Sequence, residues 1–334
     1  MKVLLFAEGL NIIGNSGLGK AIKHQMKALE YAGVEYTINP DDDYDIVHIN
    51  TYGPISFALA QVCKMNNKKI VYHAHSTEED FRDSFILSNQ ISPLFKKWII
   101  TCYELGDHIV TPTPYSKRLL EQYGIKKEIT DISNGINIDR FVKDKKLGDK
   151  FRKTYKYKKK DKVIIGIGLY LERKGILDFV ELAKRMPQYK FIWFGYTPLY
   201  SVPEKIRKAV KTELPNLQFA GYVEQDVIIQ AMNGADLYIF PTLEETEGIP
   251  VMEACACKQK ILIRDIPVFE GWLEDGVNVY KAKDIDEFEI KIDKILNNEL
   301  KDLTEEGYKI AADRDLRVIG EKLKAVYEKV LEEK

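Results

Sequence analysis

Residues 240–257 limit most strongly what this chain can fold into, because they run from a buried strand through a polar loop into a helix. Residues 235–240 are mostly apolar and end at Pro241, which is typical of the end of a parallel strand. A helix that opens at Ile249 accommodates Pro250, because a proline in the first turn lacks only an N–H that would be unpaired there. Free N–H groups and the helix dipole favour an anion in front of such a helix. The stretch therefore predicts an α/β fold with an anion-binding strand–loop–helix unit.

Two carboxylates in this stretch have a recognisable spacing: Glu245 lies in the loop, and Glu253 follows after seven intervening residues, in the helix. A carboxylate in the first turns of a helix can accept hydrogen bonds from the vicinal hydroxyls of a ribose. With Gly248 between them, the two glutamates resemble the E-x7-E signature of family 4 retaining glycosyltransferases. The sequence on both sides of the motif also resembles the family, because its features follow in the same order. These features lie at residues 216–223 and 235–236 upstream and at residues 261–267 and 274–276 downstream. The resemblance implies an α/β protein of the GT-B fold, with two Rossmann-like doubly wound domains facing a cleft.

The composition is that of a globular enzyme rather than of a nucleic-acid-binding or membrane-spanning chain. The chain has 334 residues, enough for two domains that each bury a core. A net charge of −1 argues against bulk nucleic-acid binding, and no apolar run is long enough to span a bilayer. Residues 3–7 indicate a first strand rather than a signal peptide, and the four cysteines lack metal or disulfide spacing. These features predict a cytoplasmic protein with reduced cysteines.

The chain pattern predicts three segments. An apolar N-terminus, a glycine-rich turn at residues 14–20 and a periodic helix after it form the first strand–loop–helix unit of a doubly wound domain. Residues 143–162 are rich in lysine without apolar periodicity, which predicts an interdomain linker. We therefore expect an N-terminal Rossmann-like acceptor-side domain over residues 1–158 and a C-terminal nucleotide-sugar-binding domain over residues 159–315. The amphipathic helix within residues 316–334 is expected to pack back on the N-terminal domain.

The glycine-rich turn also spells G-x-x-x-x-G-K from Gly14 to Lys20, so a P-loop nucleotidase is a distant alternative. Ala21 stands where a Ser or Thr hydroxyl would hold magnesium, which disfavours this alternative. In the glycosyltransferase interpretation, small residues such as Gly17 let the backbone approach the transferred sugar and its diphosphate. The aspartates at 41–43 precede a strand, whereas ligands bind at the carboxyl ends of such strands, so we interpret them as a solvated turn.

Two of the histidines, His73 and His75, end an apolar strand at its carboxyl edge. The segment that contains them resembles the His…Glu-Asp-aromatic segment of family 4 enzymes that glycosylate diacylglycerol lipids. The resemblance implies that His75 lines the catalytic cleft and that His73, Glu79 and Asp80 lie on the acceptor side. No third ligand accompanies the two histidines, so we expect no metal there. His48 lies inside a strand and is expected to be satisfied within the core.

The resemblance assigns the donor side to the second domain. Lys174 stands before a glycine downstream of the strand that ends at Gly168, as in members of the family. The arginine that usually follows the strand-ending glycine is Leu169 here, and Arg173 is expected to take its role. Fixed positive groups at these positions would stabilise the charge on a leaving diphosphate. The resemblance implies a catalytic set of Arg173, Lys174, Glu245 and His75, and a donor-binding set of Gly17, Gly168, Tyr222, Glu247, Gly248, Ile249 and Glu253.

The resemblance implies a retaining transfer of an α-linked hexose from a UDP-sugar, with no metal or cofactor needed for the chemistry. The overall likeness is to bacterial transferases that make glycosyl-diacylglycerols, so the expected acceptor is glucosyl-diacylglycerol or diacylglycerol. Aromatic residues mixed with lysines at 92–100, and the lysines of 143–162, predict peripheral binding to the anionic inner face of the plasma membrane. A family 4 enzyme for a soluble or undecaprenyl-linked glycan and a non-catalytic sugar-nucleotide sensor are the alternatives. Both galactose and glucose stay open as the donor sugar.

Overall fold

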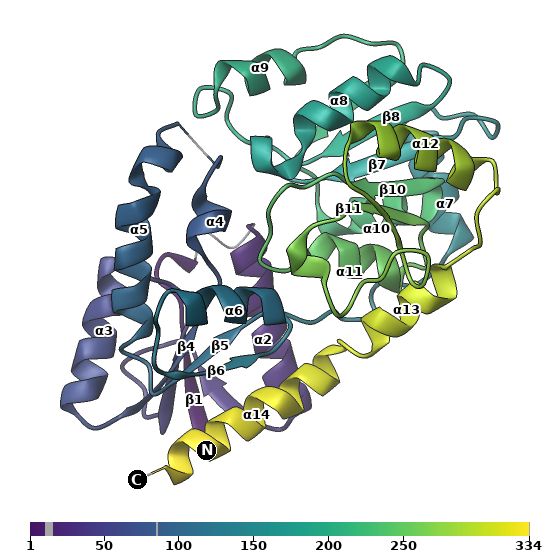
Figure 1. The fold of residues 1–334 in the computed structure, drawn as a ribbon. Coiled ribbons are helices and arrows are strands. Elements are labelled where there is room, and N and C mark those ends of the chain that lie inside the picture. The colour runs from purple at the N-terminus through teal and green to yellow at the C-terminus, as the bar shows by residue number, and fades with distance from the viewer. Residues whose placement is uncertain (11–15, 85, 334) are drawn as a thin grey trace. The chain divides into compact units, whose positions relative to one another are not determined.

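The structure is a computed structural model that describes residues 1–10, 16–84 and 86–333. It divides into two compact units, of which the first contains residues 1–81, 90–137 and 313–334 and the second contains residues 82–89 and 138–312. Each unit holds one six-stranded sheet with helices packed around it (Figure 1). The predicted α/β class with two doubly wound sheets is confirmed.

The first unit has the strand order β2-β1-β3-β4-β5-β6, and every neighbouring pair is parallel. Parallel neighbours require crossovers, and the helices between the strands supply them. The strands are β1 Lys2–Phe6, β2 Glu35–Thr37, β3 Ile46–Ile49, β4 Lys69–His73, β5 His108–Thr111 and β6 Glu128–Asp131. The helices are α2 Gly17–Tyr31, α3 Pro54–Met65, α4 Glu78–Phe81, α5 Ser88–Tyr103, α6 Pro114–Gln122 and α14 Leu316–Glu332.

The last helix, α14, belongs to the first unit and packs against α2 (Figure 1). Its apolar face, which includes Leu323 and Val330, is buried in the same core as Leu29 of α2. The two helices approach closely at Gly320, where a Cβ atom would lie 2.1 Å from the carbonyl oxygen of Ala28. The periodicity that predicted an amphipathic helix here corresponds to this buried face.

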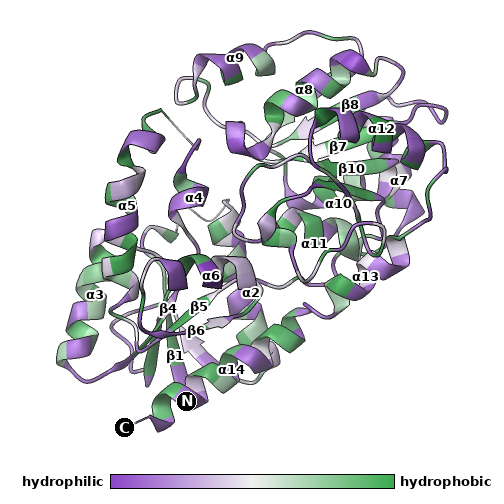
Figure 2. Ribbon diagram, in the orientation of Figure 1, coloured by the Kyte–Doolittle hydropathy of each residue, from purple (hydrophilic) through white to green (hydrophobic). Residues whose placement is uncertain are grey.

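The second unit has the strand order β12-β11-β10-β7-β8-β9, again with every pair parallel. Counted from β7, this is the 3-2-1-4-5-6 order of a dinucleotide-binding fold. The strands are β7 Val163–Ile167, β8 Lys190–Phe194, β9 Leu217–Gly221, β10 Leu237–Phe240, β11 Ile261–Arg264 and β12 Tyr280–Ala282. The helices are α7 Lys145–Thr154, α8 Ile176–Arg185, α9 Glu204–Val210, α10 Gln225–Gly234, α11 Ile249–Ala256, α12 Ile285–Leu296 and α13 Thr304–Ala312, with the short 3₁₀ helices η1 Glu172–Lys174 and η2 Pro267–Phe269. β10 and α11, which flank the loop described below, are largely green in Figure 2, and all residues of β10 are buried.

The prediction of an interdomain linker over residues 143–162 is wrong for its central part, which forms α7 and packs on α10. Phe151 is 1% exposed, and a Cβ atom on Gly234 would lie 2.5 Å from its ring. Arg152 adds an ion pair of 2.6 Å to Asp236. Phe151 is the large apolar residue of this contact, and Gly148 packs on the backbone of Asn233 beside it, whereas lysines dominate the composition of the helix. With α7 in the second unit, the division of the chain falls at residues 137–138, whereas the sequence placed it at residue 158.

Candidate functional site

The loop between β10 and α11 turns its carboxylates inward. Glu245, Glu247 and Glu253 are only 7%, 2% and 0% exposed, although the sequence indicated a polar loop. Gly248 is the N-cap of α11 and has φ +94°, a left-handed conformation that favours glycine. Buried carboxylates are costly unless they are paired or hydrogen-bonded, so this loop is built around specific polar partners.

One of these partners is Lys174, whose ammonium group forms an ion pair with Glu245. Lys174 ends η1, and the next residue, Gly175, has φ +73°. A Cβ atom on Gly175 would lie 2.1 Å from the carbonyl oxygen of Pro241, so only glycine lets η1 approach the end of β10 this closely. Two further hydrogen bonds fix the approach, because the carbonyl oxygen of Arg173 accepts from the Thr242 hydroxyl (2.9 Å) and from the Leu243 N–H (2.6 Å).

The side chain of Arg173 lies on the same loop. Its guanidinium group donates to the carbonyl oxygen of Glu244 (3.3 Å) and to the hydroxyl of Ser84 (2.8 Å), which belongs to the segment grouped with this unit. Leu169, at the position where the family usually has arginine, is 45% exposed. The structure therefore brings Arg173, Lys174 and the first glutamate of the E-x7-E pattern together at the carboxyl end of β10. Their roles stay predictions.

The second glutamate, Glu253, has two neighbours that the sequence pattern did not reveal. Gln225, the first residue of α10, donates to one carboxylate oxygen of Glu253 at 3.1 Å. The phenol of Tyr238 is completely buried, and its pKa is raised well above the usual value by burial and then by the charges of Glu253 and Glu245. Its hydroxyl has no hydrogen-bond partner within residues 1–10, 16–84 and 86–333. In the sequence Tyr238 belongs to a mostly apolar run, and only its phenol oxygen indicates that it has polar neighbours.

The remaining donor-side predictions are placed as follows. The carbonyl oxygen of Gly168 accepts from the indole N–H of Trp193 at 2.8 Å, and a Cβ atom on Gly195 would lie 2.0 Å from the same oxygen. Tyr222 follows β9 and is 50% exposed, whereas Ile249, the first residue of α11, is buried. Gly17 is the first residue of α2 in the first unit, and the predicted residues Gly14 and Asn15 lie outside the described part of the chain.

The predicted acceptor-side residues lie in the first unit around the carboxyl end of β4. His73 is the last residue of β4 and is 2% exposed, and its ring stacks on the ring of His75, a partly exposed residue, with centroids 3.8 Å apart. Burial lowers the pKa of His75 to about 3 and that of His73 well below the usual value. In α4, Glu79 accepts a hydrogen bond from the hydroxyl of Tyr123, and the N–H of Asp80 donates to Thr77 at 3.1 Å. Glu79 is therefore hydrogen-bonded to another side chain of the first unit, and its role on the acceptor side stays a prediction.

His48 is fully buried and hydrogen-bonded, as predicted for a histidine satisfied within the core. Burial lowers its pKa to about 3. No group of three or more His, Cys, Asp or Glu side chains suited to a metal ion occurs in the part of the chain that the structure describes.

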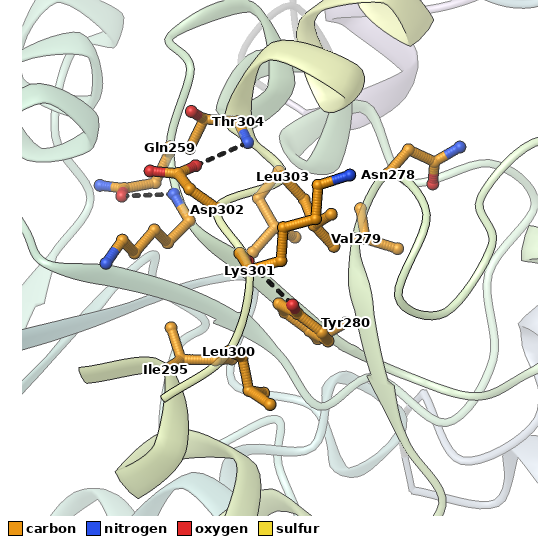
Figure 3. Close-up of a pocket in the computed structure, with 12 residues that line it drawn as sticks. Gln259, Asn278, Val279, Tyr280, Ile295, Leu300, Lys301, Asp302, Leu303 and Thr304 are labelled. Carbon is orange, nitrogen blue, oxygen red and sulfur yellow. Dashed lines mark hydrogen bonds between the residues drawn. The ribbon is translucent and has the colours of Figure 1, made fainter. Parts of the chain in front are cut away.

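A small pocket of about 20 Å³ lies in the second unit beside the chain that leads into α13 (Figure 3). Tyr280, Lys301 and Asp302 contribute to its lining, and the hydroxyl of Tyr280 donates to the carbonyl oxygen of Lys301 at 2.8 Å. A volume of this size suits a single water molecule rather than a sugar nucleotide. None of the predicted site residues lines it, so it carries no part of the candidate site.

None of the helices within the described residues is both long and apolar enough to cross a bilayer.

Comparisons with known proteins agree on one kind of enzyme. Residues 148–310 match the domain described as glycosyl transferases group 1, and residues 19–140 match the domain described as glycosyltransferase family 4. The chain is 42% identical over 334 residues to a processive diacylglycerol alpha-glucosyltransferase of Acholeplasma laidlawii, and the match covers 99% of each chain. It is 23% identical to an alpha-galactosylglucosyldiacylglycerol synthase of Streptococcus pneumoniae, over 78% of this chain and 72% of that one.

Solved structures share the fold at low sequence identity. Sucrose-phosphate synthase from Thermosynechococcus elongatus superposes with a TM-score of 0.80 at 14% identity, with 99% of both chains covered. Anabaena HepE, solved in complex with UDP-glucose, gives a TM-score of 0.78 at 15% identity and covers 98% of this chain and all of that one. These likenesses confirm the predicted GT-B fold.

Proposed function

Because the chain belongs to the glycosyltransferases with group 1 and family 4 domains, we propose that it transfers a hexose from a UDP-sugar to a diacylglycerol-based glycolipid acceptor. The observation that carries the proposal is the identity of 42% along the whole length of a diacylglycerol alpha-glucosyltransferase. Glucose is the first donor sugar to test, because the relative named for galactosyl transfer is only 23% identical. The chemistry proposed is retention of the α-configuration by attack from the face that the diphosphate leaves.

The buried polar groups of the second unit support a donor site at the carboxyl end of β10. Lys174 and Arg173 would stabilise the negative charge that the diphosphate gains as the glycosidic bond breaks, together with the N–H groups at the start of α11. Glu245 would accept hydrogen bonds from the sugar hydroxyls, and Glu253, oriented by Gln225, would accept from the ribose. In this proposal the leaving phosphate oxygen takes the acceptor proton, and no metal is needed.

The face of α5 supports a peripheral position at the anionic inner face of the plasma membrane. Ile91, Leu94 and Trp98 recur at helical spacing and are 42%, 68% and 37% exposed. Lys97 beside them is also exposed. Apolar side chains that penetrate the interface, flanked by a cation that meets lipid headgroups, favour binding to an anionic surface.

Vesicle flotation tests this surface. Leu94→Glu should reduce binding to phosphatidylglycerol vesicles at least fivefold, because a carboxylate would have to enter the apolar interface. Ile290→Glu is the matched control, since Ile290 is 55% exposed on α12 of the second unit. Equal loss with both variants would contradict a specific role for α5.

The proposed reaction is tested by measuring UDP release from UDP-glucose or UDP-galactose in EDTA, with vesicles that carry diacylglycerol, glucosyl-diacylglycerol or neither. Release that depends on the lipid and persists in EDTA is the expected result. Lys174→Ala should abolish most of it, whereas Lys184→Ala on the exposed face of α8 should not, because Lys184 pairs with Glu181 at 3.2 Å on the same helix, away from the loop after β10. Donor binding without lipid-dependent release would instead favour a soluble or undecaprenyl-linked glycan as acceptor.

A further inference from the structure

A chain of polar side chains crosses the interior of the first unit, from α14 to the residues that follow β4. The hydroxyl of Tyr327 lies 2.6 Å from Nδ1 of His48, and Nε2 of His48 lies 3.1 Å from Nδ1 of His73. All three residues are at most 2% exposed. The chain thus starts on the C-terminal helix and reaches the predicted acceptor-side histidines through two neighbouring strands.

The chain continues through two amides. The amide nitrogen of Gln25 lies 2.7 Å from Nδ1 of His73 and 2.8 Å from Oδ1 of Asn50, and that oxygen also lies 2.9 Å from Nε2 of His75. Gln25 and Asn50 are 2% and 1% exposed. Six side chains from α2, β3, β4, α14 and the ends of these strands therefore form one continuous network.

The direction of every hydrogen bond in this network is coupled to that of its neighbours. Because the pKa values of His48, His73 and His75 are all lowered, mainly by burial, each ring is neutral at pH 7 and has one N–H and one bare nitrogen. Only two arrangements give each of the five contacts a donor and an acceptor, and in both of them Nδ1 of His73 is shared between His48 and Gln25. In one, the three imidazoles carry their proton on Nε2. In the other, they carry it on Nδ1, and both amides are turned over.

Tyr327 selects between the two arrangements. Burial raises the pKa of its phenol, so the group is a neutral O–H, which is a better donor than acceptor, and a separation of 2.6 Å to a bare imidazole nitrogen is that of a strong hydrogen bond. With Tyr327 donating to Nδ1 of His48, Nε2–H of His48 donates to His73. The amide N–H of Gln25 then donates to Asn50, whose oxygen also accepts from Nε2–H of His75.

Among the described residues, three further atoms of the network have no hydrogen-bond partner in either arrangement. Oε1 of Gln25, Nδ2 of Asn50 and Nε2 of His73 are buried and lack a hydrogen-bond partner within the described ranges of the chain. Reversal of the network would exchange donors and acceptors at these atoms without adding a partner. Among the five contacts, the hydrogen bond from Tyr327 is the one that favours a direction.

The consequence falls on His75, which is partly exposed after the carboxyl end of β4, where ligands bind in open α/β sheets. With its proton on Nε2, His75 offers a bare Nδ1 as a hydrogen-bond acceptor. We propose that Tyr327, His48, His73, Gln25 and Asn50 are positioning residues that hold His75 as an acceptor for a substrate hydroxyl. The substrate hydroxyl in this proposal rests on the glycosyltransferase function proposed above. The position of the proton on His75 does not depend on that function.

The first test reads the proton positions directly. Protein labelled with ¹⁵N-histidine, studied by long-range ¹H–¹⁵N correlation at pH 7 without substrate, should show the Nε2–H tautomer for His48, His73 and His75. The Nδ1–H tautomer or a charged ring at any of the three overturns the proposal. This result does not depend on any enzymatic activity, so a failure of the proposed function and a failure of the network are distinguishable.

The second test removes the group that sets the direction. Tyr327→Phe should populate the Nδ1–H tautomer of His75 and lower kcat for sugar transfer about tenfold, with KM for the UDP-sugar changed less than twofold. Tyr36→Phe, which removes a hydroxyl bonded to the exposed Glu30, is the matched control and should change neither quantity. If Tyr327→Phe does not fold, His48→Gln replaces it with the same expectations for His75. An unchanged tautomer of His75 with an unchanged kcat in the folded variant refutes the positioning role.

Discussion

The first unit should lose stability between pH 7 and pH 5 because His48 is kept neutral inside it. Burial lowers the pKa of His48 to about 3, whereas an imidazole in the unfolded chain has a pKa near the usual 6.5. Between these values the unfolded state binds more protons than the folded state, so the free energy of unfolding falls as the pH falls. At pH 7 the unfolded imidazole is mostly neutral, and at pH 5 it is almost wholly protonated. With about 1.4 kcal/mol per pH unit, His48 accounts for a loss of about 2 kcal/mol over this interval.

Urea denaturation at pH 7 and at pH 5 measures this loss, provided that the signal comes from the first unit. Trp98 lies in the first unit, whereas Trp193 and Trp272 lie in the second, so a Trp193→Phe and Trp272→Phe background leaves one reporter in the unit of interest. His73 and His75, whose pKa values are also lowered by burial, act in the same direction and add to the total loss. The contribution of His48 is therefore obtained by difference.

In the same background, His48→Gln should make the loss between pH 7 and pH 5 smaller by about 2 kcal/mol, because the substituted side chain does not titrate. His108→Gln is the control: burial lowers the pKa of His108 too, but the charge of Glu128 opposes the shift, so the loss should change less. If the wild-type sequence and His48→Gln lose equal amounts of stability, His48 is not held neutral and the argument is refuted.

Three other substitutions probe the second unit and the helix pair of the first. Lys174→Ala should lower kcat about 10²-fold, because it removes a fixed charge at the leaving diphosphate; steady-state kinetics that match the wild type would contradict this role. Gln225→Leu should raise KM for the UDP-sugar about fivefold with kcat nearly unchanged, because Glu253 loses one orienting hydrogen bond. Gly320→Ala should destabilise the first unit by at least about 2 kcal/mol in urea denaturation, because its Cβ would lie 2.1 Å from the carbonyl oxygen of Ala28; a neutral result would mean that the two helices separate without cost.

Local sequence signals were sufficient for most of the fold. Apolar runs bounded by proline or charged residues indicate the strand that contains His48, which is β3, and the start of α11 at Ile249, both of which the structure confirms. The same signals failed at α7, where one buried phenylalanine holds a lysine-rich helix in place. Its apolar residues Leu147 and Phe151 lie one helical turn apart, but two such residues among many lysines are a weak signal in the sequence.

The candidate site was predictable to the extent that it follows a motif. The E-x7-E pattern and Lys174 led to groups that the structure brings together at one strand end, whereas Tyr238 was hidden in an apolar strand. The network around His75 could not be predicted from the sequence for a different reason, because His48 and Tyr327 are 279 positions apart. No local sequence pattern specifies a contact between residues so far apart in the sequence.

The position of α14 in the first unit also determines when that unit can be completed on the ribosome. The residues that build its sheet are synthesised first, but Leu316, Ile319 and Leu323, which cover Ala28 and Leu29 of α2, are synthesised only after the entire second unit. Until they emerge, the nascent chain carries an uncovered apolar helix face, and Tyr327 is not yet available to His48. The first unit is therefore begun first and completed last. The second unit can fold before α14 has been synthesised.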